Sequence, residues 1–480
     1  MVSKKDFRKI NDYLWEIPKT FRHDMRVPVR AYVSEKMLEA SFKDRSLEQL
    51  VNIASLPGIE KYALAMPDMH EGYGFPIGGV AATRVSDGVI SPGGIGYDQN
   101  CGVRLLKSEQ TEKEIRPQLD RLASEIQKEV PSGLGRGRQI KLSIKQIDEI
   151  LEGGAPKLVE WGYGEKEDIE NCEAGGKLVL ADANLVSGRA KNRGRDQVGT
   201  LGSGNHFAEI QKVETIFNEE AAKTFGLFKD QAVVMVHTGS RGLGHQNCTD
   251  YLRTIDRAIE KYKIRIPDRE LACVPFNSPE GQNFFKAMCA GANFAWANRH
   301  MITFYIRMAW QSVLGGKTGL KLLYDVAHNI AKVESYEVDG KEIELCVHRK
   351  GATRALPPGH PEIPEKYRET GQPVLIPGSM GTASYVLAGT KKSEEAWHTV
   401  CHGAGRTMSR HQALRMVTGQ EVIRSLAKKG IIVKCQSQRG VAEEAPLAYK
   451  DVDSVVNVVH NARLADRVAR LVPLAVIKGE

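Results

Sequence analysis

The chain has 480 residues, of which 41% are hydrophobic and 26% are charged, and this composition excludes a disordered or fibrous protein. Its length is equivalent to roughly three average domains and allows a large buried core. The formal net charge of +8 is compatible with a polyanionic partner but does not require one.

Cysteine usage and the apolar segments indicate the compartment. The eight cysteines show no C-x-x-C spacing, which excludes a zinc ribbon or a thioredoxin-type motif and favours reduced thiols. The first nine residues lack the apolar stretch of a secretory signal. The most apolar segment, 284–314, is interrupted by Lys286, Arg299 and Arg307, so it does not read as a membrane span. We therefore expect a soluble, cytoplasmic protein with no membrane partner.

Two helices stand out in chain order. Apolar residues recur at helical spacing over 112–130, where Thr111 and Glu114 form a capping pair and Pro117 predicts a kink or a delayed start. A longer helix is predicted from Ser278 and Pro279 onward. Apolar residues surround this second helix on most sides, which predicts a buried central helix.

Short apolar runs bounded by turn residues predict strands, at 233–236, 322–326, 343–347, 374–376 and 384–387. Loops are predicted at 131–138, 187–196 and 351–365. None of these loops divides the candidate site residues into separate groups, because those residues run from Asp98 to His402. We therefore expect a mixed α/β fold in one integrated domain over residues 1–480, with room for a peripheral helical lobe.

The segment 91–104 places a carboxylate, Asp98, three residues before a thiol, Cys101, in a glycine-rich turn. Both groups are good ligands for a divalent transition metal. Three later segments each end an apolar or glycine-rich run on a histidine, namely His206, His237 and His328. Each histidine taken alone is more often a core or surface residue, but the set of five favours a metal centre. Five ligands are too many for one tetrahedral ion, and a thiolate can bridge two ions.

His402 lies in a different setting, in Cys-His-Gly-Ala-Gly-Arg406. Flexible amides and a nearby cation suit a phosphate that approaches the imidazole, so His402 is a candidate nucleophile. A sixth metal ligand or a loop histidine without a role is an equally valid interpretation of the residues alone. The segment 377–384, Pro-Gly-Ser-Met-Gly-Thr-Ala-Ser, is either a nucleotide cradle or a simple turn. Walker A, G-x-G-x-x-G and K-x-D-G signatures are absent.

Basic residues cluster at Arg136 and Arg138, at 189–195 and at 349–354. Such clusters are usually solvated surface, but the second leads directly into the Gly202 to His206 loop and favours a phosphate backbone near the metals. Aromatic residues are not interleaved with these basic segments, so the sequence does not indicate base stacking.

Together these motifs resemble the RtcB family, the GTP-dependent RNA-splicing ligases of tRNA splicing and RNA repair. The resemblance covers nearly the whole chain, and the sequence is most similar to the archaeal and thermophilic bacterial branch of the family. The motifs that carry it lie at 66–79, 91–104, 201–207, 237–245, 324–329, 348–354, 377–385 and 401–406. Met69 and Glu71 replace the family's common Gly and Gln without changing a candidate ligand.

The resemblance implies an RtcB-type fold with a central β core, surrounding helices and a deep cleft that contains two Mn²⁺ ions. Asp98, Cys101 and His206 would hold one ion. Cys101, His237 and His328 would hold the other. His402 would be guanylylated by GTP, with Asp68 as a supporting partner. The residues implied to contact guanylate are Asn205, His206, Phe207, Ala208, Glu209, His328, Asn329, Pro377, Gly378, Ser379, Met380, Ser384, His402, Gly403, Ala404, Gly405 and Lys478.

The implied reaction joins an RNA 2′,3′-cyclic-phosphate or 3′-phosphate end to a 5′-hydroxyl RNA end through a histidine–GMP intermediate. RNA is the expected partner, an archease-type activator is a further one, and a monomer is the expected state. Two other functions fit the residues: a two-metal phosphoesterase that forms no covalent nucleotide, and a basic RNA-binding protein whose His and Cys residues are structural.

Overall fold

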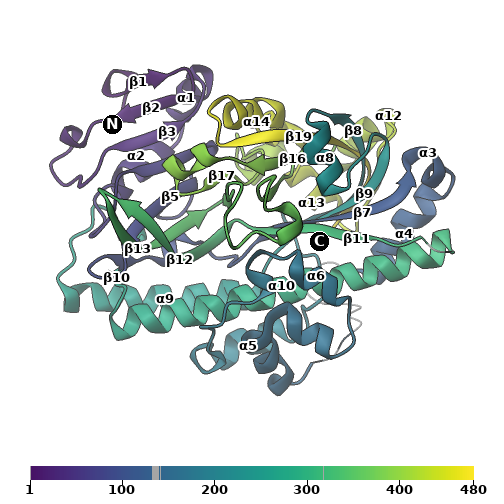
Figure 1. Cartoon of the computed structure of the whole chain (residues 1–480), viewed down its shortest axis with the longest axis horizontal. Coiled ribbons are helices and arrows are strands. Elements are labelled where there is room, and N and C mark those ends of the chain that lie inside the picture. The colour runs from purple at the N-terminus through teal and green to yellow at the C-terminus, as the bar shows by residue number, and fades with distance from the viewer. Residues whose placement is uncertain (1, 132–139, 141, 317, 480) are drawn as a thin grey trace.

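The computed structural model describes residues 2–131, 140, 142–316 and 318–479, and it confirms the predicted mixed α/β class (Figure 1). Seven strands form one sheet in the order β1-β2-β3-β4-β5-β13-β12. Their bounds are β1 Arg8–Asn11, β2 Leu14–Ile17, β3 Val29–Tyr32, β4 Ala63–His70, β5 Ile77–Arg84, β12 Asn329–Val338 and β13 Lys341–Lys350.

The second large sheet has the order β11-β7-β9-β8-β19-β16-β15, and β18 pairs in parallel with β19. Its strands are β7 Gly102–Thr111, β8 Phe207–Ile216, β9 Gln231–Thr238, β11 Lys321–Ala327, β15 Pro373–Ile376, β16 Ser384–Gly389, β18 Ile432–Lys434 and β19 Ala465–Lys478. Two small ladders pair β6 Val89–Ile90 with β10 Val274–Pro275, and β14 Ala352–Arg354 with β17 Thr399–Cys401.

Helices cover these sheets. They are α1 Glu35–Ser41, α2 Ser46–Ile53, α3 Glu112–Ile115, α4 Leu119–Glu129, α5 Ile144–Glu160, α6 Lys166–Glu170, α7 Gly188–Gly194, α8 Glu219–Phe225, α9 Arg241–Tyr262, α10 Pro279–Leu314, α11 Arg410–Met416, α12 Gly419–Lys428, α13 Gln438–Glu443 and α14 Val452–Asn461. Within the described residues, no helix has a stretch long and apolar enough to cross a membrane. No disulfide joins the eight cysteines, all of which lie in the described part of the chain.

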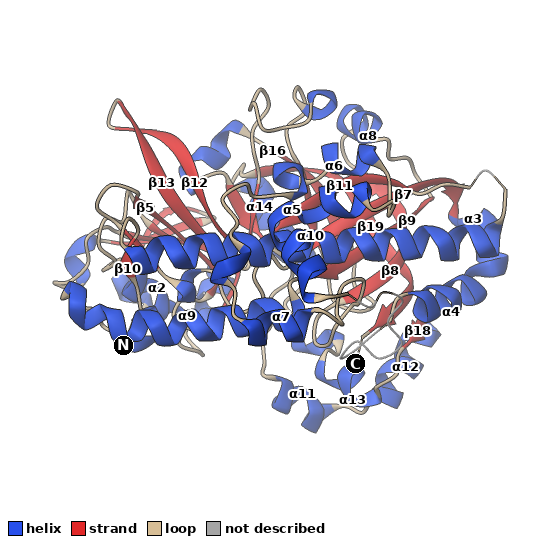
Figure 2. Cartoon of the chain, turned by 90° about the horizontal axis from the view of Figure 1, so that it is seen from below, coloured by secondary structure: helices blue, strands red, loops and turns tan. Residues whose placement is uncertain are grey.

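The predicted long helix is α10, which has 36 residues and begins where the sequence indicates. The Ser278 hydroxyl accepts a hydrogen bond from the Gly281 amide at 3.1 Å, and Pro279 occupies the first turn. Most of its side chains are buried, because α4, α5 and α9 pack around it. Figure 2 shows α9 and α10 side by side across this face.

The predicted strands are all confirmed, within β9, β11, β13, β15 and β16. In β9, Val234 and Val236 join the core cluster that contains α10, whereas Val233 and Met235 join the cluster on the opposite face. A strand buried on both faces is apolar at every position, and that is why its sequence shows a continuous run rather than alternation.

Four other predictions have different outcomes. The predicted interruption at Pro117 is confirmed, because a 3-10 turn at Arg116–Gln118 separates α3 from α4. The loop prediction for 187–196 is wrong: Ser187 caps the short helix α7 by accepting from the Ala190 amide at 3.1 Å. The loop predicted at 351–365 contains strand β14. The loop predicted at 131–138, with Arg136 and Arg138, lies almost entirely outside the described residues.

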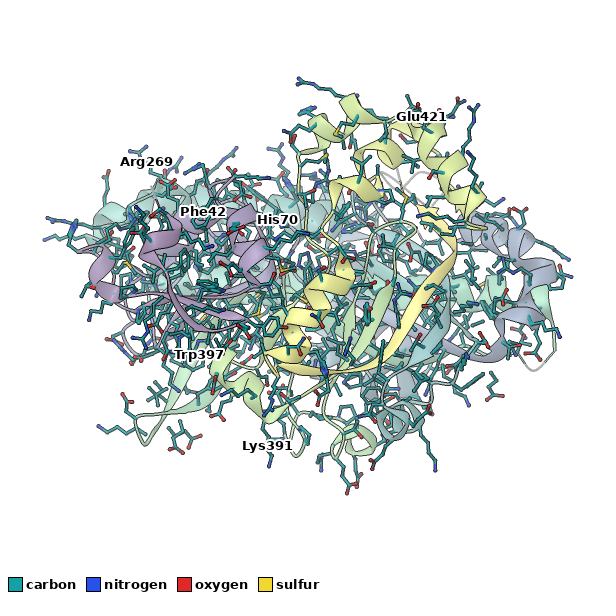
Figure 3. The ribbon with its side chains drawn as sticks, turned by 90° about the horizontal axis from the view of Figure 1, so that it is seen from above. Phe42, His70, Arg269, Lys391, Trp397 and Glu421 are labelled. Atoms are coloured by element: carbon teal, nitrogen blue, oxygen red, sulfur yellow. The ribbon has the colours of Figure 1, made fainter. Side chains whose placement is uncertain are left out.

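Figure 3 shows a helical segment, 410–443, standing above the sheets, with Glu421 of α12 on its outer side. This segment carries α11, α12 and α13. His70, at the end of β4, lies where the first, seven-stranded sheet meets this helical segment.

Candidate metal and nucleotide site

Four of the five predicted ligands lie at the ends of four adjacent antiparallel strands, on the same side of the second sheet. Cys101 immediately precedes β7, and His206 immediately precedes β8. His237 is near the end of β9, and His328 immediately follows β11. The register pairs Gly102 with both Thr238 and Ala327, and Phe207 with His237. In antiparallel neighbours the start of one strand lies beside the end of the next, so all four ligands meet on this side of the sheet.

The fifth predicted ligand, Asp98, reaches the same point from the loop before β7. Its Oδ2 lies 3.0 Å from Nε2 of His206, and its Oδ1 accepts from the Ser240 hydroxyl at 3.1 Å. A Cβ at Gly239 would lie 2.5 Å from this carboxylate, so only glycine permits the approach. Burial opposes ionisation of Asp98, but the hydrogen bond and charge of His206 lower its pKa to about 2.

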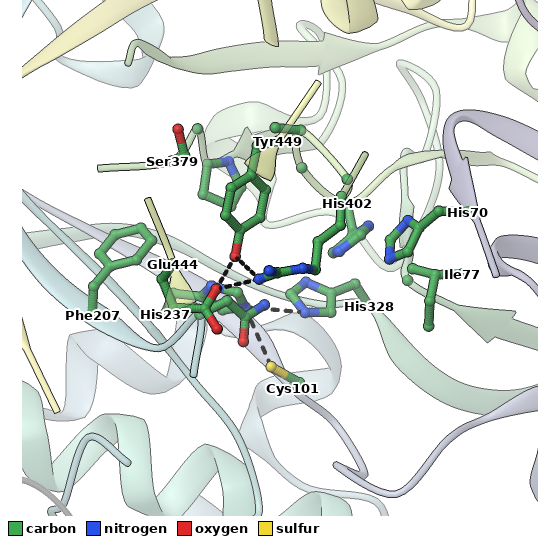
Figure 4. Close-up of a pocket in the computed structure, with 18 of the residues that line it drawn as sticks. His70, Ile77, Cys101, Phe207, His237, His328, Ser379, His402, Glu444 and Tyr449 are labelled. Carbon is green, nitrogen blue, oxygen red and sulfur yellow. Dashed lines mark hydrogen bonds and ion pairs between the residues drawn. The ribbon is translucent and has the colours of Figure 1, made fainter. Parts of the chain in front are cut away.

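The donor atoms form two groups that share Cys101. One group is Asp98, Cys101 and His206, and the other is Cys101, His237 and His328; within each group all ligand atoms lie within 4.8 Å of one another. The Cys101 Sγ lies 3.5 Å from Nε2 of His206 and 3.3 Å from Nε2 of His237. Nε2 of His237 lies 3.3 Å from Nε2 of His328. Figure 4 shows Cys101, His237, His328 and His402 converging on the pocket.

The protonation states suit a metal. Burial and the neighbouring histidines lower the pKa of His237 and His328 well below the usual value, so both rings are neutral ligands. Nδ1 of His206 faces the Leu201 carbonyl oxygen at 3.1 Å, which directs the Nε2 lone pair at the cluster. Nδ1 of His328 is buried without a hydrogen-bond partner in the described residues. Imidazole nitrogens, a thiol and a carboxylate gathered this closely are ligands of divalent transition metals, and the donor set therefore fits two divalent ions.

His402 lies beside this cluster, with its ring centroid 4.9 Å from that of His328. It follows β17 directly, and Asp68 of β4 holds it in place. Asp68 Oδ2 lies 2.5 Å from His402 Nδ1 and accepts from the His402 amide at 3.0 Å. Gly405 has φ +73° and a Cβ there would lie 2.2 Å from the Asp68 carbonyl oxygen, so the turn after His402 requires glycine. Asp68 thus engages Nδ1 of His402, and the other ring nitrogen, Nε2, is the one available to a ligand.

A cavity of about 250 Å³ joins His402 to the metal cluster. Most residues that the sequence implies as guanylate contacts line it: Asn205, Phe207, His328, Asn329, Pro377, Gly378, Ser379, Met380, His402, Gly403, Ala404, Gly405 and Lys478. The Ala208 side chain instead packs in the core cluster beside α10, and its backbone lies between the paired strands β9 and β19.

Lys478 of β19 lines the cavity, and Glu209 lies on the neighbouring strand, since β8 and β19 pair Phe207 with Lys478. Glu209 is buried, one oxygen accepts from Gln211 at 2.7 Å, and the other, Oε1, has no hydrogen-bond partner in the described residues. Burial raises the pKa of Glu209 to about 8 and lowers the pKa of Lys478 to about 8. Ser384 lies next to them and accepts from Gln211 at 3.0 Å and from the Gly378 amide at 3.1 Å.

The structure adds lining residues that the sequence does not reveal. Arg410, Glu444 and Tyr449 come from the helical segment and its flank, and His70 comes from β4. Glu444 pairs with Arg406 at 2.8 Å and with Arg410 at 2.9 Å. Arg406 is thus already neutralised by a carboxylate. No motif marks this segment, so only its position in the fold could identify these residues.

The basic segments separate in the structure. Within 349–354, Arg349 pairs with Glu334 at 2.6 Å and Arg354 pairs with Glu362 at 2.7 Å, and both guanidinium groups are buried. This cluster is therefore an internal ion-pair network rather than solvated surface. The segment 189–195 lies largely on α7, where Arg189 and Arg193 are exposed.

Comparison with known proteins gives one consistent result. The family model described as tRNA-splicing ligase RtcB matches residues 49–479. A tRNA-splicing ligase RtcB from Thermococcus kodakarensis is 54% identical over 98% of both chains, and one from Aeropyrum pernix is 53% identical over 98% of this chain and 99% of its own. The RNA-splicing ligase RtcB of Mycobacterium tuberculosis is 52% identical over 90% of this chain and its entire own length. The chain belongs to the RtcB family of tRNA-splicing ligases.

Proposed function

We propose that this protein ligates RNA 2′,3′-cyclic-phosphate or 3′-phosphate ends to 5′-hydroxyl RNA ends, using GTP, two Mn²⁺ ions and a covalent His402–GMP intermediate. Membership of the family supports the ligase activity. The observation that carries the finer proposal is the position of His402, held at Nδ1 by Asp68 and placed between a two-group metal cluster and a nucleotide-sized cavity.

Two Mn²⁺ ions would be held by Asp98, Cys101 and His206 and by Cys101, His237 and His328. When bound, the ions would neutralise charge that develops on the reacting phosphates. The mixed carboxylate, imidazole and thiolate donors are compatible with manganese, although this donor chemistry also suits other divalent ions.

His402 is the proposed nucleophile. Its Nε2 attacks the α-phosphorus of GTP, a P–N bond forms, and the bond between the α-phosphorus and the bridging oxygen breaks to release pyrophosphate. Asp68 accepts the Nδ1 hydrogen bond, so it fixes the ring orientation and offsets the positive charge that the ring acquires.

The remaining steps transfer GMP to RNA. Water first opens a 2′,3′-cyclic phosphate to a 3′-phosphate. An oxygen of this 3′-phosphate attacks the guanylate phosphorus, the P–N bond breaks, and an RNA–GMP anhydride forms. The 5′-hydroxyl oxygen of the second RNA then attacks the 3′-phosphorus and loses its proton, and GMP leaves as the phosphodiester forms.

Glu209 supports a preference for guanine. Its unpaired Oε1 lies on the same face of β8 as Phe207, beside Lys478. Once ionised, the Glu209 carboxylate can accept from the N1–H and 2-amino groups of guanine, whereas adenine has neither donor at these positions. An ammonium such as Lys478 can donate to the guanine O6.

Labelling with GTP tests the proposal. Incubation with α-labelled GTP and Mn²⁺, followed by denaturing electrophoresis, is expected to give acid-labile, alkali-stable label on the wild type. His402→Ala is expected to show no label, because it lacks the attacking nitrogen. The matched control is His360→Ala. His360 lies outside the cavity, so this variant is expected to carry the same GTP-derived label as the wild type.

Two results of the labelling experiment would contradict the proposed mechanism. Label that persists on His402→Ala would refute the nucleophile assignment. An unlabelled wild type that binds manganese would refute the covalent intermediate and favour a two-metal phosphoesterase.

RNA is the proposed substrate, such as tRNA exon halves or broken RNA. An archease-type activator, a monomeric state, a cytoplasmic location and a single domain over 1–480 stay predictions.

A further inference from the structure

Three aromatic rings from distant parts of the sequence meet at the surface. Tyr97 and His245 are stacked, with ring centroids 4.8 Å apart and planes inclined by 24°. Tyr73 adjoins Tyr97 with centroids 5.8 Å apart. His245 is exposed and both tyrosines are partly exposed. Neither phenol hydroxyl has a hydrogen-bond partner among the residues that the structure describes. We call these three rings the aromatic platform.

The platform is continuous with the metal site. Tyr97 immediately precedes Asp98, and His245 lies one turn along α9 from Ser240, whose hydroxyl donates to Asp98. Burial lowers the pKa of His245, and Asp98 is close enough to oppose that shift by its charge. The platform therefore borders the loop that carries Asp98.

A buried lysine supports the platform from beneath. Lys350 of β13 donates from Nζ to the Tyr73 carbonyl oxygen. A Cβ at Gly72 would lie 3.4 Å from Nζ of Lys350, and a Cβ at Gly96 would lie 3.5 Å from its Cε. The loops that carry Tyr73 and Tyr97 thus rest on one side chain, so the rings are held in place before any ligand binds.

A cation borders the platform. Helix α7 packs beside the start of α9 (Figure 2), and Arg193 of α7 donates to Gln246, the neighbour of His245, at 3.1 Å. Arg193 is exposed, and no carboxylate in the described ranges lies within ion-pair distance of it. By contrast, Lys191 on the same helix is paired with Asp148 at 2.7 Å. An unneutralised guanidinium beside exposed rings matches the alternation of phosphate and base in a single strand.

We propose that the aromatic platform binds nucleobases of the RNA strand that enters past Asp98, and that Arg193 contacts the phosphate between them. The inference rests on the proposed RNA ligase function and extends it to a substrate-binding surface. Stacking on exposed rings is tolerant of base identity, because every base has a π face. The surface would therefore hold RNA ends of many sequences in line with the metals.

Binding of RNA strands with single abasic positions tests this. Fluorescence anisotropy would measure the affinity of the wild type for short strands ending in 5′-hydroxyl or 3′-phosphate, with the abasic position moved inward from the reacting end. We expect one or two positions near the end of one strand where loss of the base weakens binding about tenfold. Absence of any such position would overturn the proposal without the need for a variant.

Variants of the platform residues test which side chains contact the bases. His245→Ala and Tyr97→Leu should each weaken binding of intact RNA about tenfold and remove the effect of the abasic position. The matched control is Phe217→Ala, since Phe217 is 42% exposed and stacked on Tyr385 but follows the end of β8 opposite to His206. This control should bind intact and abasic RNA like the wild type.

The outcomes separate this inference from the proposed function. If the effects of the variants and of the abasic position simply add, the bases contact another surface and the platform is refuted. If the wild type forms guanylate but shows no position-specific base effect, only the platform is refuted. If the wild type forms no guanylate, the proposed function fails and the platform fails with it.

Discussion

Cys101 is the residue on which both candidate metal groups depend, because its Sγ belongs to each of them. Burial and the nearby Asp98 charge raise the pKa of the Cys101 thiol well above its usual value, so the thiol is protonated until a cation is present. Metal binding must then release this proton, and the affinity of both groups should fall together at low pH.

Substitution of the shared and the unshared ligand should have different results. Cys101→Ala should lose both Mn²⁺ ions, whereas Asp98→Asn should lose only the ion that it shares with His206. Metal content after dialysis, counted by mass spectrometry, checks this. Cys435→Ala is the control, because this half-buried thiol lies outside the cavity. Two ions retained in Cys101→Ala would show that the thiol does not bridge the groups.

At the scale of elements, α10 supports the site from behind through Arg299. This buried guanidinium donates to the carbonyl oxygens of Asn100 at 2.7 Å and Thr238 at 3.0 Å. It also binds both oxygens of Asp325, at 2.9 and 2.8 Å. Asn100 adjoins Cys101, Thr238 adjoins His237, and Asp325 lies on the strand that leads to His328. One side chain therefore connects three ligand-bearing segments.

Arg299→Lys should accordingly weaken Mn²⁺ binding by about 10- to 100-fold, because an ammonium cannot reach all three segments. Titration of the metal by calorimetry gives the affinity. Arg307→Lys on the same helix is a matched control, since Arg307 binds both oxygens of Asp168 at 2.6 and 2.7 Å and otherwise donates to the Leu320 carbonyl oxygen, at the end of β11 far from His328. Equal losses in the two variants would indicate a general effect of α10 rather than positioning of the ligands.

The elements also show what the sequence could predict. Helix α10 and strand β9 have clear signals, because a capped apolar helix and a doubly buried strand leave few alternatives. In the first sheet, the sequence predicts β13 but not β1 to β5: β4 contains Pro67 and β5 contains Gly78 and Gly79, which weaken the strand pattern. The sequence of α7 resembles a loop because of its glycines, asparagine and charges, and the cap at Ser187 is its one helical signal.

The residues of the candidate site also fall into two groups, those that the sequence indicates and those that only the fold brings to the cavity. Asp98, Cys101 and His402 lie in short glycine-rich motifs, so the sequence indicates them directly. Glu444 and Tyr449 reach the cavity only because the helical segment folds back over it, and that packing is a tertiary property without a local signal. The aromatic platform was hidden for the same reason.

At the scale of the whole molecule, burial keeps histidines neutral in several regions. His70, His300, His348 and His398 all have a pKa lowered to about 4, chiefly by burial. Above pH 6.5 these rings are neutral in both the folded and the unfolded chain, so their contribution to stability is fully present. Between pH 6.5 and 4 the unfolded chain takes up protons that the folded chain resists. The free energy of unfolding should therefore fall as the pH is lowered through this range.

His348 allows a direct test of that pH dependence. Its Nε2 accepts from the Ser91 amide at 3.2 Å, so a proton there would face another N–H group. His348→Gln keeps an acceptor but cannot be protonated. Its loss of stability between pH 6.5 and 4, followed by urea unfolding, should be smaller by up to about 1.4 kcal/mol per pH unit. Parallel curves for the wild type and the variant would contradict the assignment.

The position of β19 in the second sheet has a consequence for synthesis of the chain. This strand lies between β8 and β16 inside the sheet, where residues near 478 pair with residues near 207. While the ribosome is still adding the last segments, β8 and β16 each present an unpaired edge, and exposed edges invite pairing with other chains. Assembly of the sheet must wait until β19 has been synthesised, and such long-range pairing is slow. We therefore expect nascent chains to depend on chaperones until β19 emerges.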